Sequence, residues 1–291
     1  MDGFTGVRQR ASRREGSARG AIALAPAVST YLNALVAACV TSCCEPVSVV
    51  VFGSAARGGL FSKGSDVDTL VIVSDEVSED RQHALGKEIA LLETEHGFRT
   101  SISSRPASYE DMAEHLSGNS FSAFICSESD LLSGDSARIL KLHPIEALLV
   151  DRIVLATILD SAVTFRGKDL LACVDTPPIR RLDVLKASIS FLGVLLMSSM
   201  LYPVLPNSTK YSMGALKRSL HSCFYVCNRR SASLEEEVCY FRVRLRKTQA
   251  LGDLMARRSQ YDPSLRFVIA AFPQIVRLQI YALREGTFDR R

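Results

Sequence analysis

The sequence predicts an α+β protein, in which a small mixed sheet with flanking helices is followed by a C-terminal helical bundle. Two short β-branched runs, at residues 47–52 and 66–74, predict neighbouring strands. Apolar residues with helical spacing flank these runs, and the same spacing continues through most of the chain beyond Pro144. A helical half therefore follows a mixed half.

The chain length predicts two domains, since 291 residues exceed the usual size of one. Residues 1–20 combine Arg, Ser and Gly with almost no large apolar side chain, which predicts a disordered basic tail. We expect the mixed domain over residues 21–140 and a helical substrate or partner domain over residues 141–291.

The expected elements of the mixed domain follow from local pattern. Val28, Leu32 and Leu35 mark one face of a helix over residues 26–44. The run 47–52 reads as a buried strand that ends at Gly53, and 66–74 resumes a second strand that pairs with it. Residues 79–96 predict a helix that Gly97 ends, and residues 98–103 predict a third strand, followed by a short helix from 108.

The helical domain is expected to contain long helices separated by Pro177-Pro178 and by residues 203–208. Their expected ranges are 145–161, 182–201, 210–229, 234–257 and 263–284.

Composition excludes several classes of protein. Apolar residues make up 47% of the chain and charged residues 23%, as in globular proteins. The net charge of +4 is too small to indicate a protein that coats nucleic acid. No continuous apolar run reaches the roughly 18–20 residues of a membrane span. We therefore expect a cytoplasmic protein without a membrane partner, and the interrupted apolar stretch 21–40 is interpreted as a core helix rather than a leader.

The eight cysteines show no disulfide framework and are interpreted as reduced core residues. The pairs Cys39/Cys43 and Cys223/Cys227 have helical spacing, so a metal site with His221 is an alternative, although four ligands are not apparent.

The segment 51–73 carries the chemistry. Gly53 at the end of a strand lets the backbone turn sharply and approach a ligand closely. Ser54 would open a helix whose free N–H groups and hydroxyl face an anion. Arg57, one turn later, can complement phosphate charge, and Lys63 or Ser65 in the Gly/Ser-rich loop can do the same. This arrangement suits a triphosphate.

Asp66 and Asp68 flank Val67, and alternate side chains of a strand share a face. Two carboxylates held that close repel each other unless a divalent cation bridges them, and oxygen ligands beside phosphate indicate Mg²⁺. Two ions roughly 3.5–4 Å apart would serve the attacking hydroxyl and the leaving pyrophosphate. The predicted reaction is nucleotidyl transfer.

The order Gly-Ser, residues 55–65, Asp-Val-Asp between two apolar strands resembles the DNA polymerase beta-like nucleotidyltransferase superfamily. Within that superfamily, the motif is most similar to those of the minimal nucleotidyltransferases and the aminoglycoside adenylyltransferases. The resemblance implies a nucleotidyltransferase-type sheet, two Mg²⁺ ions, ATP as donor and AMP transfer to a hydroxyl. It also implies a phosphate-binding basic group from the helical domain, for which Lys217 is the candidate.

One departure from this superfamily concerns the third carboxylate, which its members usually carry on the next core strand. The expected strand, Arg99-Thr-Ser-Ile-Ser-Ser104, offers only hydroxyls. Glu93 and Glu95 are possible substitutes, but on a helix before Gly97 they are interpreted as solvated surface charges.

The leading hypothesis is an adenylyltransferase whose acceptor is an aminoglycoside-like small molecule, with a protein side chain or an RNA end as alternatives. A second hypothesis is a degenerate domain that binds nucleotide or a partner without turnover. A third is an RNA-associated protein that uses the basic tail and the basic helices.

Overall fold

A four-stranded mixed sheet forms the N-terminal part of the protein in the computed structural model, which describes residues 24–56, 67–98, 122–142, 147 and 150–289. The strands are β1 (Pro46–Val51), β2 (Thr69–Val73), β3 (Ala123–Ser127) and β4 (Val163–Gly167), in the order β3-β2-β1-β4. β1 is antiparallel to β2 and β4, and β2 is parallel to β3. The predicted pairing of the two β-branched runs is confirmed.

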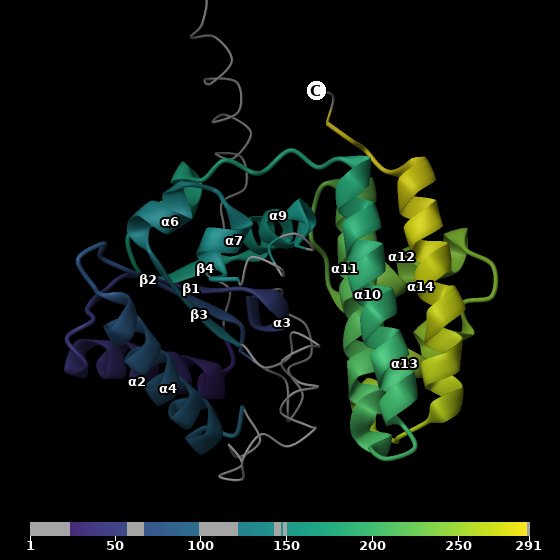
Figure 1. Cartoon of the computed structure of the whole chain (residues 1–291), viewed down its shortest axis with the longest axis horizontal. Helices are drawn as coiled ribbons and strands as arrows, with labels where there is room; N and C mark the ends of the chain where they lie inside the picture. Colours follow the sequence, from purple (N-terminus) through teal and green to yellow (C-terminus); the bar gives the residue numbers. More distant parts are fainter. Residues whose placement is uncertain (1–23, 57–66, 99–121, 143–146, 148–149, 290–291) are drawn as a thin grey trace, which may run out of the picture.

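Helices cover both faces of this sheet (Figure 1). α2 (Pro26–Thr41) and α4 (Glu79–Glu95) pack on one face, where Tyr31, Leu35 and Ile89 are buried against β1 and β2. On the other face α9 (Arg152–Ser161) joins the short helices α6 (Glu128–Leu132) and α7 (Ser136–Ile139) over a second core. The helices expected at 26–44 and 79–96 are confirmed, although the first ends at Thr41, before Cys43 with φ +53°. Gly97 has the expected left-handed backbone, with φ +75°.

Two strands of the sheet were not predicted from the sequence. β3 and β4 were not expected, and β4 pairs with β1 although it lies beyond residue 140, where the helical domain was predicted to begin. Five-residue strands with little alternation carry a weak local pattern, so pairing within the sheet decides their conformation. The expected strand at 98–103, except Phe98, the expected helix from 108 and the basic tail all lie outside the described residues.

The C-terminal part is the predicted helical bundle. Its helices are α10 (Arg181–Leu201), α11 (Thr209–Asn228), α12 (Leu234–Arg244), α13 (Gln249–Ser259) and α14 (Leu265–Glu285). Short 3₁₀ turns lie at Leu170–Cys173 and Pro206–Ser208. The single helix expected over 234–257 is wrong, because the chain breaks between α12 and α13, where Lys247 has φ +58°.

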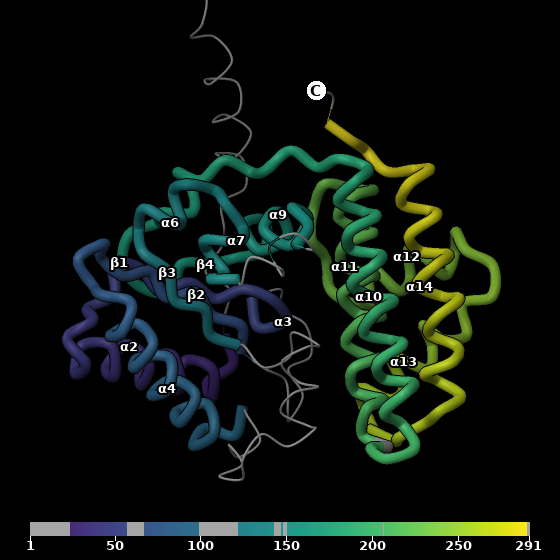
Figure 2. The backbone as a smooth tube through the Cα atoms, viewed as in Figure 1, coloured from purple at the N-terminus to yellow at the C-terminus, as the bar shows by residue number. Residues whose placement is uncertain are grey.

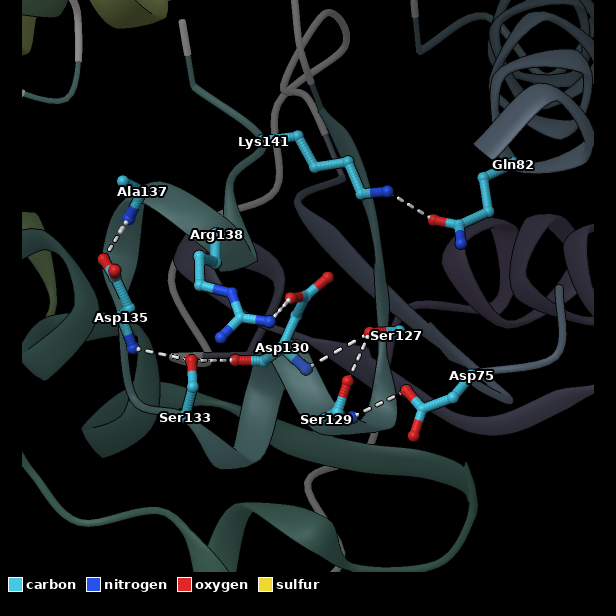
Figure 3. Close-up of polar contacts among 10 residues, drawn as sticks. All are labelled: Asp75, Gln82, Ser127, Ser129, Asp130, Ser133, Asp135, Ala137, Arg138 and Lys141. Carbon is cyan, nitrogen blue, oxygen red and sulfur yellow. Dashed lines mark hydrogen bonds and ion pairs between the residues drawn. The ribbon is translucent and has the colours of Figure 1, made fainter. Parts of the chain in front are cut away.

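Polar contacts fix the connection from β3 to α7 at one end of the sheet (Figure 3). The Ser127 hydroxyl accepts from the backbone N–H of Asp130 and so caps α6, while Asp75, just past β2, accepts from the backbone N–H of Ser129 at 3.0 Å. These hydrogen bonds hold the pKa of Asp75 below its usual value. Lys141 donates to Gln82 of α4 at 2.6 Å. This end of the sheet is therefore tied to helices on both of its faces.

α9 joins the sheet to the bundle, since it packs against both α3 (Gly53–Ala56) and α11. Asp151 caps α9 by accepting from the backbone N–H of Val154 at 3.1 Å. Burial raises the pKa of this carboxyl to about 7. Burial also lowers the pKa of Arg218 on α11, and the neighbouring Asp151 carboxyl partly offsets that shift.

All eight cysteines are free thiols. Cys39, Cys44, Cys126 and Cys223 are buried as expected, but Cys43, Cys173 and Cys239 are exposed, so the interpretation as core residues is wrong for these three. The alternative metal ligand His221 instead pairs through Nδ1 with Glu237 at 2.6 Å.

Two bundle helices, α10 and α14, are long and apolar enough to cross a membrane by length and composition alone. No continuous apolar run marks them in the sequence, because serines and charged residues interrupt α10, and glutamines and arginines interrupt α14. Only 33% of the most apolar window of α10 and 44% of that of α14 are buried inside the protein.

Candidate functional site

The turn after β1 is the centre of the candidate site. Phe52 donates its backbone N–H to the backbone oxygen of Asp68 at 3.0 Å, which brings the end of β1 beside the start of β2. Gly53 follows with φ +70°, in the left-handed region that favours glycine, and opens the short helix α3. The sharp turn predicted for Gly53 is confirmed.

The side chain of Asp68 occupies the space that a side chain at residue 53 would need. A Cβ added to Gly53 would lie 2.9 Å from Cγ of Asp68 and would overlap its Oδ2. Ordinary carbon contacts lie at about 3.5–4.0 Å, so any side chain at residue 53 would displace the Asp68 carboxylate from this position. The carboxylate therefore lies directly against the backbone that begins α3.

The structure brings together three of the predicted site residues, Gly53, Ser54 and Asp68, at one end of the sheet. Ser54 is half-buried in α3. Lys217 lies on α11, which reaches α3 by way of α9. Figure 1 shows α3 on the side of the sheet that faces α10 and α11. Asp66, Arg57 and Ser65 lie outside the described residues, so their roles stay predictions.

Glu93 is buried, and its interpretation as a solvated surface charge is wrong. Its side chain is only 2% exposed. Oε1 accepts a hydrogen bond from the Ser122 hydroxyl at 2.5 Å and another from the Tyr31 hydroxyl at 3.4 Å. Burial, together with the neighbouring Glu93 charge, raises the pKa of Tyr31. Glu95, two residues later, is exposed as expected.

This buried carboxylate stabilises the strand ends beside Asp68. The backbone oxygen of Ser122 accepts from the N–H of Thr69 at 2.7 Å, so the Glu93–Ser122 contact fixes the start of β3 against the start of β2. Thr69 points into the core under α2 and α4, and neighbouring strand residues alternate faces. Asp68 therefore points away from Glu93, which does not take the place of a third ligand.

The strand next to β2 carries no carboxylate. β3 reads Ala-Phe-Ile-Cys-Ser, and its pairing of Thr69 with Ala123 puts Ser122 level with Asp68. In the part of the chain that the structure describes, no group of three His, Cys, Asp or Glu side chains could hold a metal ion. Asp68 is nevertheless a half-buried oxygen donor held in a defined place, which is the chemistry that Mg²⁺ selects.

Local sequence gave no signal for the Tyr31–Glu93–Ser122 contact. Its members come from α2, α4 and the segment before β3, and they meet only because both helices pack on the same face of the sheet. The one local hint is the position of Glu93 four residues after Ile89 on the buried stripe of α4.

Comparison with known proteins agrees with this site. Residues 37–117, which include β1, α3 and β2, match the nucleotidyltransferase domain family. No curated protein matches the chain in sequence. Among solved structures, the crystal structure of spectinomycin adenyltransferase AAD(9) from Enterococcus faecialis, with ATP and spectinomycin, is similar in fold. Its TM-score is 0.54 at 11% sequence identity, and the alignment covers 86% of this chain and 98% of that one. The chain therefore contains, at residues 37–117, a match to the nucleotidyltransferase domain family, within a fold similar to that of a solved adenyltransferase.

Proposed function

We propose that the protein is a Mg²⁺-dependent adenylyltransferase that moves AMP from ATP to a hydroxyl of a small molecule. The observation that carries the proposal is the contact of the Asp68 carboxylate with the backbone of Gly53. It joins the two halves of the Gly-Ser and Asp-x-Asp motif at the point where a helix begins beside the sheet. An acidic group and backbone donors at one place suit a metal-bound triphosphate.

Each residue of the motif then has a role. Asp66 and Asp68 hold Mg²⁺, which when bound neutralises the triphosphate and the leaving pyrophosphate. Gly53 and Ser54 present backbone N–H groups and a hydroxyl to phosphate oxygens. Arg57, Ser65 and, from the bundle, Lys217 are proposed as further phosphate ligands. Glu93 acts indirectly, because it positions the strand ends beside Asp68.

An aminoglycoside-like molecule is the proposed acceptor. The solved structure of similar fold holds ATP together with spectinomycin, and the alignment with it covers 86% of this chain. We place the acceptor on the side of the sheet end that faces the bundle, where α3 lies (Figure 1).

The test is pyrophosphate release from Mg-ATP and from Mg-GTP by the purified full-length protein. A panel of aminoglycosides with spectinomycin, and bulk tRNA as a separate arm, supplies the acceptors. We expect release that requires a small molecule and ATP, and that falls by at least about 100-fold in Asp68→Asn. Asp75→Asn, at the opposite end of β2, is the matched control and should keep its activity. Release equal in the two variants would refute the site.

A second candidate is a domain that binds nucleotide without turnover. It is favoured by the absence of an acidic residue from β3 and by the engagement of Glu93 with Ser122 and Tyr31. Without a charged base, deprotonation of the acceptor hydroxyl falls to another group or to the acceptor itself. Saturable binding of Mg-ATP that Asp68→Asn removes, together with no pyrophosphate release for any acceptor, would select this candidate.

A further inference from the structure

The bundle carries an exposed apolar surface on α10 and α14. We define this apolar face by Leu182, Ile189 and Leu196 of α10 and by Ile269, Phe272 and Ile280 of α14. These six side chains are 44–61% exposed, and the three on α10 recur every seven residues. A seven-residue apolar repeat is the pattern of a helix that packs along another helix.

The two halves of the apolar face lie on the same side of the bundle. α10 and α14 run antiparallel, since the backbone of Ile179 before α10 pairs with Asp289 after α14. Figure 2 shows the two helices side by side. Between them the Ser188 hydroxyl donates to Gln279 Oε1 at 3.1 Å, so these two residues mark the line of contact.

The residue after each of these two polar groups belongs to the apolar face. Ile189 and Ile280 are each rotated by about 100° from the contact line, because a helix turns once in about 3.6 residues. In antiparallel helices, equal rotations in the chain direction bring both side chains to the same side of the pair. The two stripes are therefore neighbours on one surface.

Charge is depleted on this surface and collects at one flank. After Lys186, α10 has no charged residue as far as its end at Leu201. The arginines of α14, Arg266, Arg277 and Arg284, fall by helical phase on the flank away from α10. A charge-poor centre with a charged border is the composition of a protein–protein interface.

The size of the surface fits a dimer. Leu185 and Met200 continue the α10 stripe and are 47% and 72% exposed. With them, the exposed apolar side chains amount to on the order of 800 Å², above the roughly 300–600 Å² of the largest patch on a monomer and near the ~800 Å² that each partner buries in a standard interface.

We propose that α10 and α14 form a homodimer interface, in which the apolar face of one copy packs on the same face of a second copy. A two-fold axis makes such a contact self-complementary, so one surface serves both partners. Four helices, two from each copy, then form a closed layer. The arginine flank stays at its rim, where charge is tolerated.

The first experiment measures the mass of the full-length protein in solution by light scattering after gel filtration and by sedimentation equilibrium. We expect twice the chain mass. Ile189→Glu combined with Ile269→Glu should give the chain mass with unchanged far-ultraviolet circular dichroism, because both positions are 61% exposed. Val243→Glu is the matched control, since Val243 is 80% exposed on α12, outside the apolar face, and this variant should remain dimeric.

Three outcomes would overturn the proposal. They are a wild-type monomer at high micromolar concentration, a double variant as dimeric as the control, and a monomer whose apolar face binds vesicles of phosphatidylcholine and phosphatidylglycerol. The last outcome would identify the apolar face as a membrane-binding surface. It would be recognised when the wild-type protein floats together with the vesicles and the double variant does not.

A second measurement does not depend on disrupting the face. Gly193 of α10 and Gly252 of α13 both leave open space where a Cβ would stand. In a background with Cys43, Cys173 and Cys239 changed to Ser, a short bismaleimide should link Gly193→Cys into dimers but leave Gly252→Cys monomeric on a denaturing gel. Equal cross-linking of the two would refute the interface.

Discussion

Gly53→Ala is expected to lower activity by about 100-fold at a small cost in stability. The added methyl would stand 2.9 Å from Cγ of Asp68, against the 3.5–4.0 Å of ordinary carbon contacts, so the carboxylate must move by about 1 Å. A displacement of that size in a catalytic group lowers the rate by about 100-fold. The left-handed backbone adds a cost of about 1–2 kcal/mol to folding, because residue 53 has φ +70°.

Gly97→Ala is the control that separates the cost of a left-handed backbone from the effect of contact with Asp68. Gly97 has φ +75°, but a Cβ there meets nothing within 4 Å. Both variants should unfold a few degrees below wild type, since about 1 kcal/mol corresponds to roughly 2–4 °C in a chain of this size. Only Gly53→Ala should lose pyrophosphate release or, for a protein without turnover, Mg-ATP affinity. Equal activity of the two variants would refute the argument that a side chain at residue 53 displaces the Asp68 carboxylate.

Two further substitutions test the contacts that hold the sheet. Glu93→Ala should lower the free energy of unfolding, measured in urea, by about 1–3 kcal/mol, because the Ser122 and Tyr31 hydroxyls lose their acceptor. Glu95 is exposed, so Glu95→Ala should stay within about 0.5 kcal/mol of wild type. Equal effects of the two substitutions would contradict the burial of Glu93. Asp75→Asn tests charge: hydrogen bonds lower the pKa of Asp75, so its contribution is present above the unfolded value of about 3.9 and is lost as pH falls through the folded pKa. The melting temperatures of wild type and Asp75→Asn should therefore differ at neutral pH and converge in acid, and a constant difference would show that the charge contributes nothing.

The elements that local pattern could predict are those whose pattern is long or strongly β-branched. The run Val47–Phe52 and the stripe of Val28, Leu32 and Leu35 both predicted what the structure contains. β3 and β4 were missed because five residues with mixed polarity become strands only beside β2 and β1. The break at Lys247 was missed because apolar spacing continues across it into α13.

The candidate site was predictable to the extent that it rests on one continuous motif. Gly53 and Asp68 meet as the Gly-Ser and Asp-x-Asp spacing implies. Glu93 was misread because its burial depends on Tyr31 from another helix and on Ser122 from a distant segment, neither of which a helical pattern can reveal.

The position of β4 late in the sequence affects how the protein can be cut into expression fragments and how it folds during synthesis. One edge of β1 is covered only when residues 163–167 pair with it, far later in the chain than β2. A fragment that stops at residue 140 would leave the backbone donors and acceptors of a buried, valine-rich strand open to any other chain. An expression fragment of the sheet must therefore continue past Gly167. On the ribosome, that strand edge must stay protected until synthesis has passed the same point.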